Sequence, residues 1–427
     1  MHKKRGLPQN GFALERYFCY SIFFQNRGAV DSVRTMIGIS KLYLNKVEVS
    51  DPLRYGRQSA ALPSHLLQFS ADKKPVVVWN VTSRCNLSCT HCYASVGQDC
   101  GDELDTQAAL AVIDDLAAFG VPVVLFSGGE PFVRPDILAL SRHAVSKGLR
   151  VVFSTNGTLI DKRLAEEIKA VGVSYVGISI DGTELVHDRF RACEGAFRNA
   201  IEGIRNCREA GVKVGLRVTM TRDNVGEIPA IFDLMEQERI PRICLYHLVY
   251  SGRGADLMAH DLSAGQRRAT LDLIIDRTKL LHERGFPVEV LTVDNHCDGP
   301  YLYLRMVREQ NPLADDVMTL LHMNGGNSTG LGIGCISWDG TVYPDQFWRN
   351  RPVGNVREKK FSEIWGNPPP GSLLAELRQR KQRVTGRCAT CRFLDVCGGN
   401  FRARAEAATG ILWGVDPACY LTDEEIR

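Results

Sequence analysis

The feature that most constrains the fold is a regular alternation that begins at residue 76. Short runs rich in β-branched and aromatic residues alternate with longer segments of helical periodicity, which is typical of βα units and a parallel sheet. Six such runs are present: "VVVWNVT" (76–82), "VPVVLFSGG" (121–129), "LRVVFSTNG" (149–157), "VSYVGISIDG" (173–182), "VKVGLRVTM" (212–220) and "RICLYHLV" (242–249). The sequence therefore predicts an α/β fold.

The segments between these runs are amphipathic. In "GAFRNAIEGIRNCREAG" five apolar side chains share one helical face: Phe197, Ala200, Ile201, Ile204 and Cys207. Six βα units are too few for the closed eight-stranded barrel, so we expect a partial (β/α)6 barrel that stays open. Functional residues of such folds lie at the C-terminal ends of the strands.

Length and composition limit the alternatives. The 427 residues are enough for a barrel and a smaller second domain. A net charge of +3 gives no argument for nucleic acid or an acidic membrane surface, and no apolar run approaches the ~20 residues of a membrane span. "RYFCYSIFF" is short and lacks a cleavage site, so we do not interpret it as a signal peptide. Fourteen cysteines then indicate a reducing compartment, which we take to be the cytoplasm.

The alternation of strand-like and helical segments also divides the chain into parts. A long helix is expected over 262–285, whereas residues 296–331 look irregular and contain the Gly-rich loop "NGGNSTGLGIG". The expected parts are an N-terminal extension without clear periodicity (1–35), a lead-in (36–75), the α/β core (76–290), linker and substrate loops (291–331), and a small cysteine-rich domain (332–427).

Three cysteines follow the first strand within eight positions: Cys85, Cys89 and Cys92. Packing alone rarely explains such a density of thiols, whereas a closed structural metal site requires four ligands. The residues alone allow a zinc site completed by His91 or Cys100, or an iron–sulfur cluster with one open position.

A second group of cysteines lies near the C-terminus. Cys388, Cys391 and Cys397 form CxxCxxxxxC, and Cys419 follows after 21 intervening residues. Four thiolates can complete either an all-cysteine zinc site or an iron–sulfur cluster.

The spacing CxxxCxxC, together with "SGGEP" at the end of the second strand, resembles the radical S-adenosylmethionine (SAM) superfamily. The resemblance implies that the first three thiolates hold a 4Fe–4S cluster whose fourth iron binds the amino and carboxylate groups of SAM. It also implies that Gly128, Gly129 and Glu130 meet the SAM ammonium. Further implied cofactor contacts are His91, Ser154, Asn156, Ser179, Asp181 and Arg217. On chemistry alone, Ser, Asn and Asp at strand ends serve equally well as caps and turns.

The C-terminal cysteines resemble the SPASM/twitch extension of that superfamily. The resemblance implies an auxiliary 4Fe–4S cluster on Cys388, Cys391, Cys397 and Cys419. Asp345 and Phe401 stand where a second set would have thiolates, so we expect one auxiliary cluster. Cys335 is then a buried remnant or an occasional ligand.

Five further stretches resemble the tetrapyrrole-modifying branch of the superfamily: residues 37–80, "LYHLVYSGRG" (245–254), "TVDNHCDG" (292–299), "NGGNSTG" (324–330) and "WDGTVYPDQFW" (338–348). The resemblance implies removal of acetate side chains from 12,18-didecarboxysiroheme to give Fe-coproporphyrin III. In that chemistry a reduced cluster cleaves SAM, and the 5′-deoxyadenosyl radical abstracts hydrogen from an acetate side chain. A flavodoxin- or ferredoxin-like protein would supply electrons.

Several polar residues in or beside these stretches are candidates for substrate contact. Arg253, Arg349 and Arg351 could clamp carboxylates, and His247 and His296 could approach the substrate iron or donate protons. A surface arginine or a hydrogen-bonded core histidine is the commoner role of each. Other functions remain open: propionate removal in haem d1 synthesis, decarboxylation of Fe-coproporphyrin III to haem, peptide maturation, or zinc binding without catalysis. "SGGEP" after a strand argues against the last.

Overall fold

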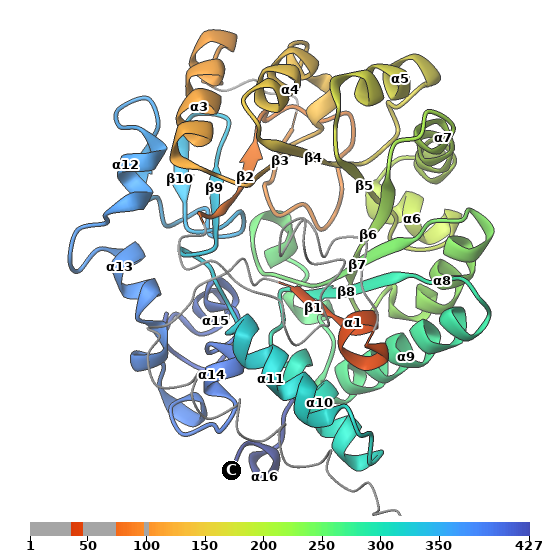
Figure 1. Ribbon diagram of the computed structural model, residues 1–427, viewed down its shortest axis with the longest axis vertical. Coiled ribbons are helices and arrows are strands. Elements are labelled where there is room, and N and C mark those ends of the chain that lie inside the picture. Colours follow the sequence, from red (N-terminus) through yellow and green to blue (C-terminus); the bar gives the residue numbers. More distant parts are fainter. Residues whose placement is uncertain (1–35, 46–73, 98–101) are drawn as a thin grey trace, which may run out of the picture.

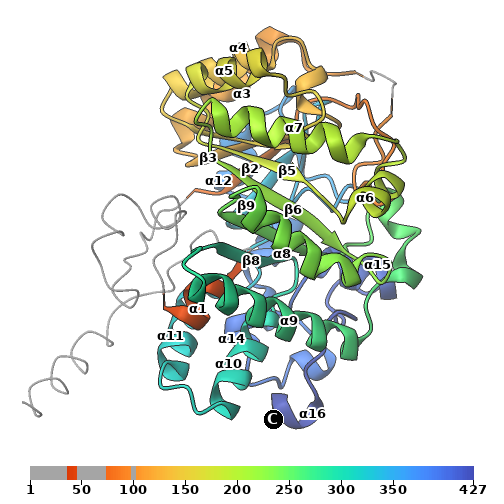
Figure 2. The same cartoon turned by 90° about the vertical axis from the view of Figure 1, so that its right-hand side faces the viewer.

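The computed structural model describes residues 36–45, 74–97 and 102–427 (Figure 1). One sheet of 11 strands forms its centre, in the order β1-β8-β7-β6-β5-β4-β3-β2-β9-β10-β11. The two edge strands, β1 and β11, do not pair with each other, so the sheet is not closed. Figure 2 shows α3, α4, α5 and α7 on the outer side of this curved sheet.

The six predicted strands are confirmed as neighbours in a parallel array. They are β2 (Val76–Asn80), β3 (Val123–Ser127), β4 (Arg150–Thr155), β5 (Tyr175–Ser179), β6 (Val214–Met220) and β7 (Arg242–His247). A seventh parallel strand, β8 (Glu289–Val293), pairs with β7 and was not predicted. Its buried residues include Glu289 and Thr292, which interrupt the apolar run that identifies the other strands.

Helices connect the parallel strands. They are α3 (Thr106–Phe119), α4 (Ile137–Ser146), α5 (Lys162–Val171), α6 (Glu184–Arg191), α7 (Ala196–Glu209), α8 (Ile228–Gln237) and α9 (Ala264–Glu283). The predicted apolar face of α7 is buried at Ala200, Ile201, Ile204 and Cys207. An aspartate caps the first turn of α3, and a left-handed glycine ends that helix. These two residues determine where α3 begins and ends.

The expectation of irregular structure over 296–331 was wrong. This region contains α10 (Asp298–Arg308) and α11 (Ala314–Asn324). Gly299 and Pro300 obscure the start of α10, although proline is tolerated in the first turn, where its missing N–H has no intrahelical partner. Tyr301, Leu302 and Met306 are the buried apolar residues beyond it.

Elements from the two chain ends extend the sheet. On one side β1 (Met36–Gly38) pairs antiparallel with β8, and α1 (Ile39–Leu44) follows it. On the other, β9 (Ile333–Ile336) pairs parallel with β2 and leads into β10 (Thr341–Tyr343) and β11 (Gly354–Asn355). The cysteine-rich region expected to begin at residue 332 therefore starts as part of the core sheet.

Short helices complete the C-terminal region: α12 (Phe361–Gly366), α13 (Leu373–Arg378), α14 (Leu394–Cys397), α15 (Arg402–Thr409) and α16 (Asp423–Ile426). The expected extension 1–35, most of the lead-in 36–75 and Cys100 lie outside the described residues. Within the described ranges, no helix is both long and apolar enough to cross a membrane.

Candidate active site and iron–sulfur sites

A cavity opens at the C-terminal ends of the parallel strands, as predicted; we call it the strand-end cavity. Its wall brings together residues from the first cysteine loop, from the ends of β3 to β7, and from the C-terminal region. Twelve residues singled out from the sequence line it: Cys85, Cys89, His91, Cys92, Gly128, Gly129, Ser154, Asn156, Ser179, Arg217, His247 and Arg253. Glu130, Asp181, His296, Arg349 and Arg351 are not among its lining residues.

The first three cysteines lie on a loop that is held by hydrogen bonds from two arginines. The Nε of Arg253 donates to the carbonyl oxygen of Cys89 at 2.8 Å, and its Nη1 donates to that of Val96 at 3.1 Å. Arg191 Nη1 donates to the sulfur of Cys89 at 3.5 Å. Burial, aided by the neighbouring Cys89 and Cys92, raises the pKa of Cys85 to about 12. Bound iron would supply the positive charge that favours its thiolate.

The two glycines of "SGGEP" allow this loop to lie directly against the end of β3. Gly128 adopts φ +128°, and a Cβ there would lie 2.7 Å from the carbonyl oxygen of Thr82. A Cβ on Gly129 would lie 1.9 Å from the carbonyl oxygen of Arg84. Only glycine can occupy these positions without displacing the loop. The close packing forms a cradle in which backbone faces the cavity beside the cysteines.

Glu130 supports the cavity wall. The side chain is fully buried, and its two oxygens accept hydrogen bonds from Thr155 Oγ1 at 2.7 Å and from the Asn156 backbone N–H at 2.8 Å. Burial raises the pKa of Glu130 to about 7, although these hydrogen bonds oppose the shift. The carboxylate therefore positions the end of β4, a role that its sequence motif did not reveal.

Asp181 likewise acts from behind the wall. It is fully buried, pairs with Arg191 at 2.5 Å, and lies 3.6 Å from His91 Nε2. His91 reaches the cavity, and burial lowers its pKa to about 4, so its ring is neutral near pH 7. Asp181 thus orients a neutral imidazole and the arginine that contacts Cys89.

The remaining predicted cofactor residues lie along the strand ends. Asn156 Nδ2 donates to Asn86 Oδ1 at 2.8 Å, which links β4 to the cysteine loop. Ser154 and Ser179 line the cavity from β4 and β5. Arg217 on β6 lines the cavity, and its guanidinium carbon lies 4.6 Å from the centroid of the Tyr246 ring, on which it stacks. Together they add polar side chains to the cavity wall.

The predicted histidines differ in their positions. His247 ends β7 and lines the cavity; its Nε2 lies 2.9 Å from Asp298 Oδ2, while the other oxygen of Asp298 accepts from Tyr420 at 2.6 Å. His296 is buried outside the cavity wall, and its backbone N–H donates to Asn400 Oδ1 at 2.7 Å. Of the two, only His247 is placed to face a substrate in this cavity.

Two of the proposed arginine clamps are engaged elsewhere. Arg349 stacks over the ring of Trp338 at 4.3 Å, and Arg351, 48% exposed, pairs with Glu406. Arg253 lines the cavity, but two of its nitrogens donate hydrogen bonds to the cysteine loop. The structure therefore gives Arg253 a loop-holding role that the sequence did not indicate.

The four C-terminal cysteines are close enough to influence one another. Burial raises the pKa of the Cys397 thiol, and Cys419, Cys388 and Cys391 add to the rise. A fifth thiol joins them, since Cys297 at the start of α10 hydrogen-bonds with Cys419 and lowers the pKa of that group. Nothing in the spacing of Cys297 predicted this proximity.

Neither cysteine group has the geometry of a single-ion site. Among residues 36–45, 74–97 and 102–427, no three or more His, Cys, Asp or Glu side chains are arranged to hold one metal ion. Zinc requires its ligands around one point, whereas each thiolate of a 4Fe–4S cluster binds its own iron.

Asp345 and Phe401 stand where a second auxiliary cluster would have cysteine ligands, and both have structural roles. Asp345 accepts from Thr329 Oγ1 at 2.8 Å and from the Phe347 backbone N–H at 2.9 Å, and Phe401 packs against the Phe347 ring. Cys335 is fully buried on β9, where Asn80 Nδ2 lies 3.8 Å from its sulfur. These contacts agree with one auxiliary ligand set.

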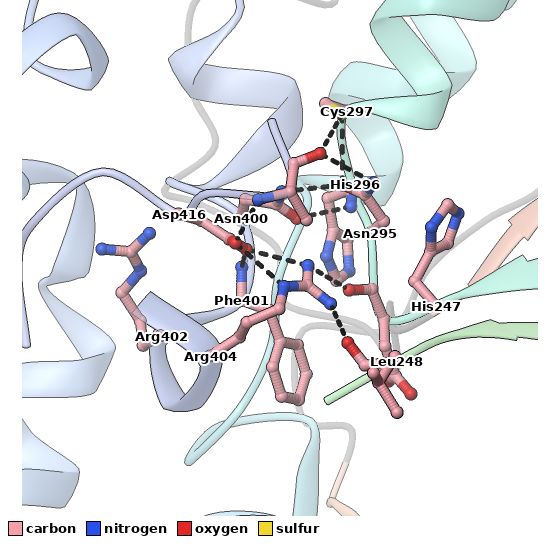
Figure 3. A network of polar contacts seen from close by, with 12 residues as sticks. His247, Leu248, Asn295, His296, Cys297, Asn400, Phe401, Arg402, Arg404 and Asp416 are labelled. Atoms are coloured by element: carbon pink, nitrogen blue, oxygen red, sulfur yellow. Dashed lines mark hydrogen bonds and ion pairs between the residues drawn. The ribbon is translucent and has the colours of Figure 1, made fainter. Parts of the chain in front are cut away.

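A buried ion pair connects the C-terminal region to the cavity. Arg404 on α15 and Asp416 are both fully buried and form two hydrogen bonds of 2.9 Å (Figure 3). Arg404 also donates to the carbonyl oxygens of Leu248 at 3.0 Å and Asp294 at 2.8 Å. These partners lie beyond the ends of β7 and β8, so the pair fixes α15 against the strand ends.

Known proteins share these features. Residues 79–235 match the radical SAM superfamily and residues 332–392 an iron–sulfur cluster-binding domain. The chain is 59% identical to Fe-coproporphyrin III synthase of Methanosarcina barkeri over 92% of this chain and 99% of that protein. It is 41% identical to pre-heme d1 synthase of Dinoroseobacter shibae, covering 82% and 87%. The fold matches SuiB of Streptococcus suis bound to S-adenosylmethionine, with a TM-score of 0.64 at 17% identity, covering 82% and 78%. The chain therefore belongs to the radical SAM superfamily, with a C-terminal iron–sulfur cluster-binding domain.

Proposed function

We propose that this radical SAM enzyme removes two acetate side chains from 12,18-didecarboxysiroheme and forms Fe-coproporphyrin III. The observation that carries the proposal is the 59% identity to Fe-coproporphyrin III synthase along nearly the full length of both chains. The strand-end cavity agrees with it, since three thiols, two imidazoles and three arginines line one space there. We place the reaction in the cytoplasm, with electrons from a flavodoxin- or ferredoxin-like protein.

The residues divide into three roles. Cys85, Cys89 and Cys92 would hold the first 4Fe–4S cluster, and Cys388, Cys391, Cys397 and Cys419 the auxiliary one. When bound, the first cluster and SAM together supply the 5′-deoxyadenosyl radical. The glycine cradle and the strand-end side chains of β4 to β6 would bind SAM beside the cysteine loop. Glu130 and Asp181 do not line the cavity, but they contact residues that do and hold them in position.

The other side of the cavity would hold the tetrapyrrole. Arg253 presents positive charge to its carboxylates. His247 faces the same space with its ring fixed by Asp298, so it can approach the iron or a side chain. Phe347 and Val249 add apolar surface to the wall. Charged donors beside apolar wall suit a flat macrocycle that bears carboxylates.

Product analysis tests the proposal against its two nearest alternatives. Anaerobically reduced protein is incubated with SAM and either 12,18-didecarboxysiroheme or Fe-coproporphyrin III, and the tetrapyrroles are identified by mass. We expect conversion of the first compound to Fe-coproporphyrin III and no conversion of the second. Loss of propionates from the first would indicate the haem d1 reaction, and conversion of the second to haem would indicate haem synthase activity.

A further inference from the structure

Asp294 is a cavity residue that the proposed roles do not include. It follows β8 directly, is 3% exposed, and lines the strand-end cavity. One carboxyl oxygen, Oδ2, is buried and has no hydrogen-bond partner among the described residues. Its backbone has φ +65°, the left-handed region in which only glycine, asparagine and aspartate are common. A buried polar atom without a partner is costly, so this position calls for a functional explanation.

Two other buried carboxyl groups near the cavity, Glu130 and Asp298, differ in this respect. Glu130 accepts from Thr155 and Asn156, and Asp298 accepts from His247 and Tyr420. Each of these groups is fixed in a network of hydrogen bonds. Asp294 alone among the three leaves an oxygen available at the cavity wall.

Charged groups near Asp294 are already engaged with other partners. Arg404 contacts its backbone carbonyl, while the guanidinium is paired with Asp416. Arg217 is stacked on Tyr246. Asp345 adds negative charge from beyond β10. Both arginines thus lie close enough to stabilise a carboxylate without forming a side-chain ion pair with it.

Burial raises the pKa of Asp294 to about 8, and Asp345 adds to the rise, while Arg404 and Arg217 oppose it. Below that pH the carboxyl group carries a proton. A neutral acid that faces a reaction cavity, with positive charge ready to stabilise its conjugate base, has the properties of a general acid.

We propose that Asp294 donates the proton that each departing acetate side chain requires. The inference rests on the proposed function. For the step to balance, the hydrogen abstracted by the adenosyl radical would come from the ring carbon next to the one that bears the acetate. The bond between the acetate-bearing ring carbon and the side-chain methylene would then break. One of its electrons would pair with the ring radical in a new C=C bond, and the other would stay on the CH2–COOH fragment. That fragment would take one electron from a reduced iron–sulfur cluster and one proton from Asp294. An O–H bond breaks, a C–H bond forms, and acetic acid leaves; water restores the proton.

Asp294→Asn is the informative variant. Asparagine fits the same left-handed backbone and has nearly the same shape, but it has no acidic proton to give. A role that depends only on the shape of the side chain would therefore survive the change. Asp339→Asn is the control, because Asp339 lies in the turn between β9 and β10 and accepts from the Thr341 N–H at 3.0 Å, outside the cavity wall.

The reaction is run in D₂O, and acetic acid, Fe-coproporphyrin III, 5′-deoxyadenosine and iron are measured. Wild-type protein should release acetic acid with one solvent-derived deuterium per methyl group, at a rate that falls as pH rises through about 8. Asp294→Asn should form product ~100-fold more slowly, with iron content, tetrapyrrole binding and 5′-deoxyadenosine formation within about twofold of wild type. Asp339→Asn should match wild type.

A product rate within tenfold of wild type in Asp294→Asn overturns the inference, as does acetic acid without deuterium. Loss of iron or of tetrapyrrole binding in that variant would assign Asp294 a structural role and overturn it as well. If wild-type protein releases no acetic acid, the proposed function itself fails, and the role of Asp294 fails with it.

Discussion

Single thiols determine how many clusters the protein carries. Cys419 lies among the C-terminal cysteines and hydrogen-bonds with Cys297, whereas Cys335 is packed on β9 beside Asn80. The same residue type therefore lies in a group of thiols in one place and in a packed core in another. Burial and neighbouring thiols distinguish the two environments, and the spacing of the cysteines alone does not.

Iron content tests this distinction. Wild-type protein reconstituted without oxygen should carry about eight irons, in two 4Fe–4S clusters. Cys419→Ala should lose up to about four of them and keep SAM cleavage without substrate, because the first cluster is intact. Cys335→Ala and Cys297→Ala should both keep the full iron content. Iron loss in Cys335→Ala equal to that of Cys419→Ala would show that Cys335 is a ligand.

Residues whose contact partners lie far away in the sequence could not be predicted from the sequence. Arg191 contacts the sulfur of Cys89 across 102 positions, and Arg404 contacts Asp294 across 110. No local pattern marks either arginine. The cysteines and the glycine pair were predictable because their chemistry depends on spacing within a few residues. Asp294 lay in a recognised stretch, but its unpartnered oxygen is visible only in the folded structure.

The cysteine loop and the end of β3, which together form part of the cavity wall, are in direct backbone contact. The cysteine loop and the end of β3 touch where Gly129 faces the carbonyl oxygen of Arg84. Two backbone hydrogen bonds of 2.9 Å join them, from Gly129 N–H to Thr82 and from Glu130 N–H to Arg84. A side chain at position 129 would separate the two elements and move the cysteines relative to the residues that we propose bind SAM.

Gly129→Ala should therefore abolish SAM cleavage and lower the iron bound by the first cluster. Its matched control is Gly265→Ala in α9, where an added Cβ meets nothing within 4 Å. That change should leave activity intact and stabilise the fold by about 0.4–1 kcal/mol, since alanine is the less flexible residue in the unfolded chain. Normal SAM cleavage by Gly129→Ala would mean that the contact between the two elements is dispensable.

The α15 ion pair offers a second test at this scale. Arg404→Met leaves the fully buried Asp416 without its partner, which should cost about 3–5 kcal/mol in the free energy of unfolding. Arg351→Met breaks the partly exposed pair with Glu406 and should cost no more than about 1 kcal/mol. Denaturant unfolding of both variants measures the difference. Similar values would show that Arg404 does not anchor α15 to the strand ends.

At the scale of elements, the sequence predicted what local periodicity determines. All six parallel strands and the α7 face were correct, because apolar residues mark them at regular spacing. β8 was missed because Glu289 and Thr292 are buried within it. α10 was missed because Gly299 and Pro300 disguise its first turn. The pairing of β9 with β2 joins segments about 255 positions apart and leaves no local mark.

Across the whole molecule, one path of hydrogen bonds leads from the cavity toward the C-terminal cysteines. His247 lines the cavity and contacts Asp298, and Asp298 accepts from Tyr420, which directly follows Cys419. Gln346 and Phe347 bring the C-terminal region into the cavity wall itself. The two cysteine groups therefore belong to one continuous structure around the cavity.

The central claim is that this cavity generates one radical for each acetate removed. The most direct measurement is the ratio of 5′-deoxyadenosine to Fe-coproporphyrin III formed from 12,18-didecarboxysiroheme by reduced protein with excess SAM. Because two acetates leave and each requires one SAM, we expect a ratio of about two, with neither product formed by Cys85→Ala. A tetrapyrrole product that has lost propionates, or product formation by Cys85→Ala, would contradict the account.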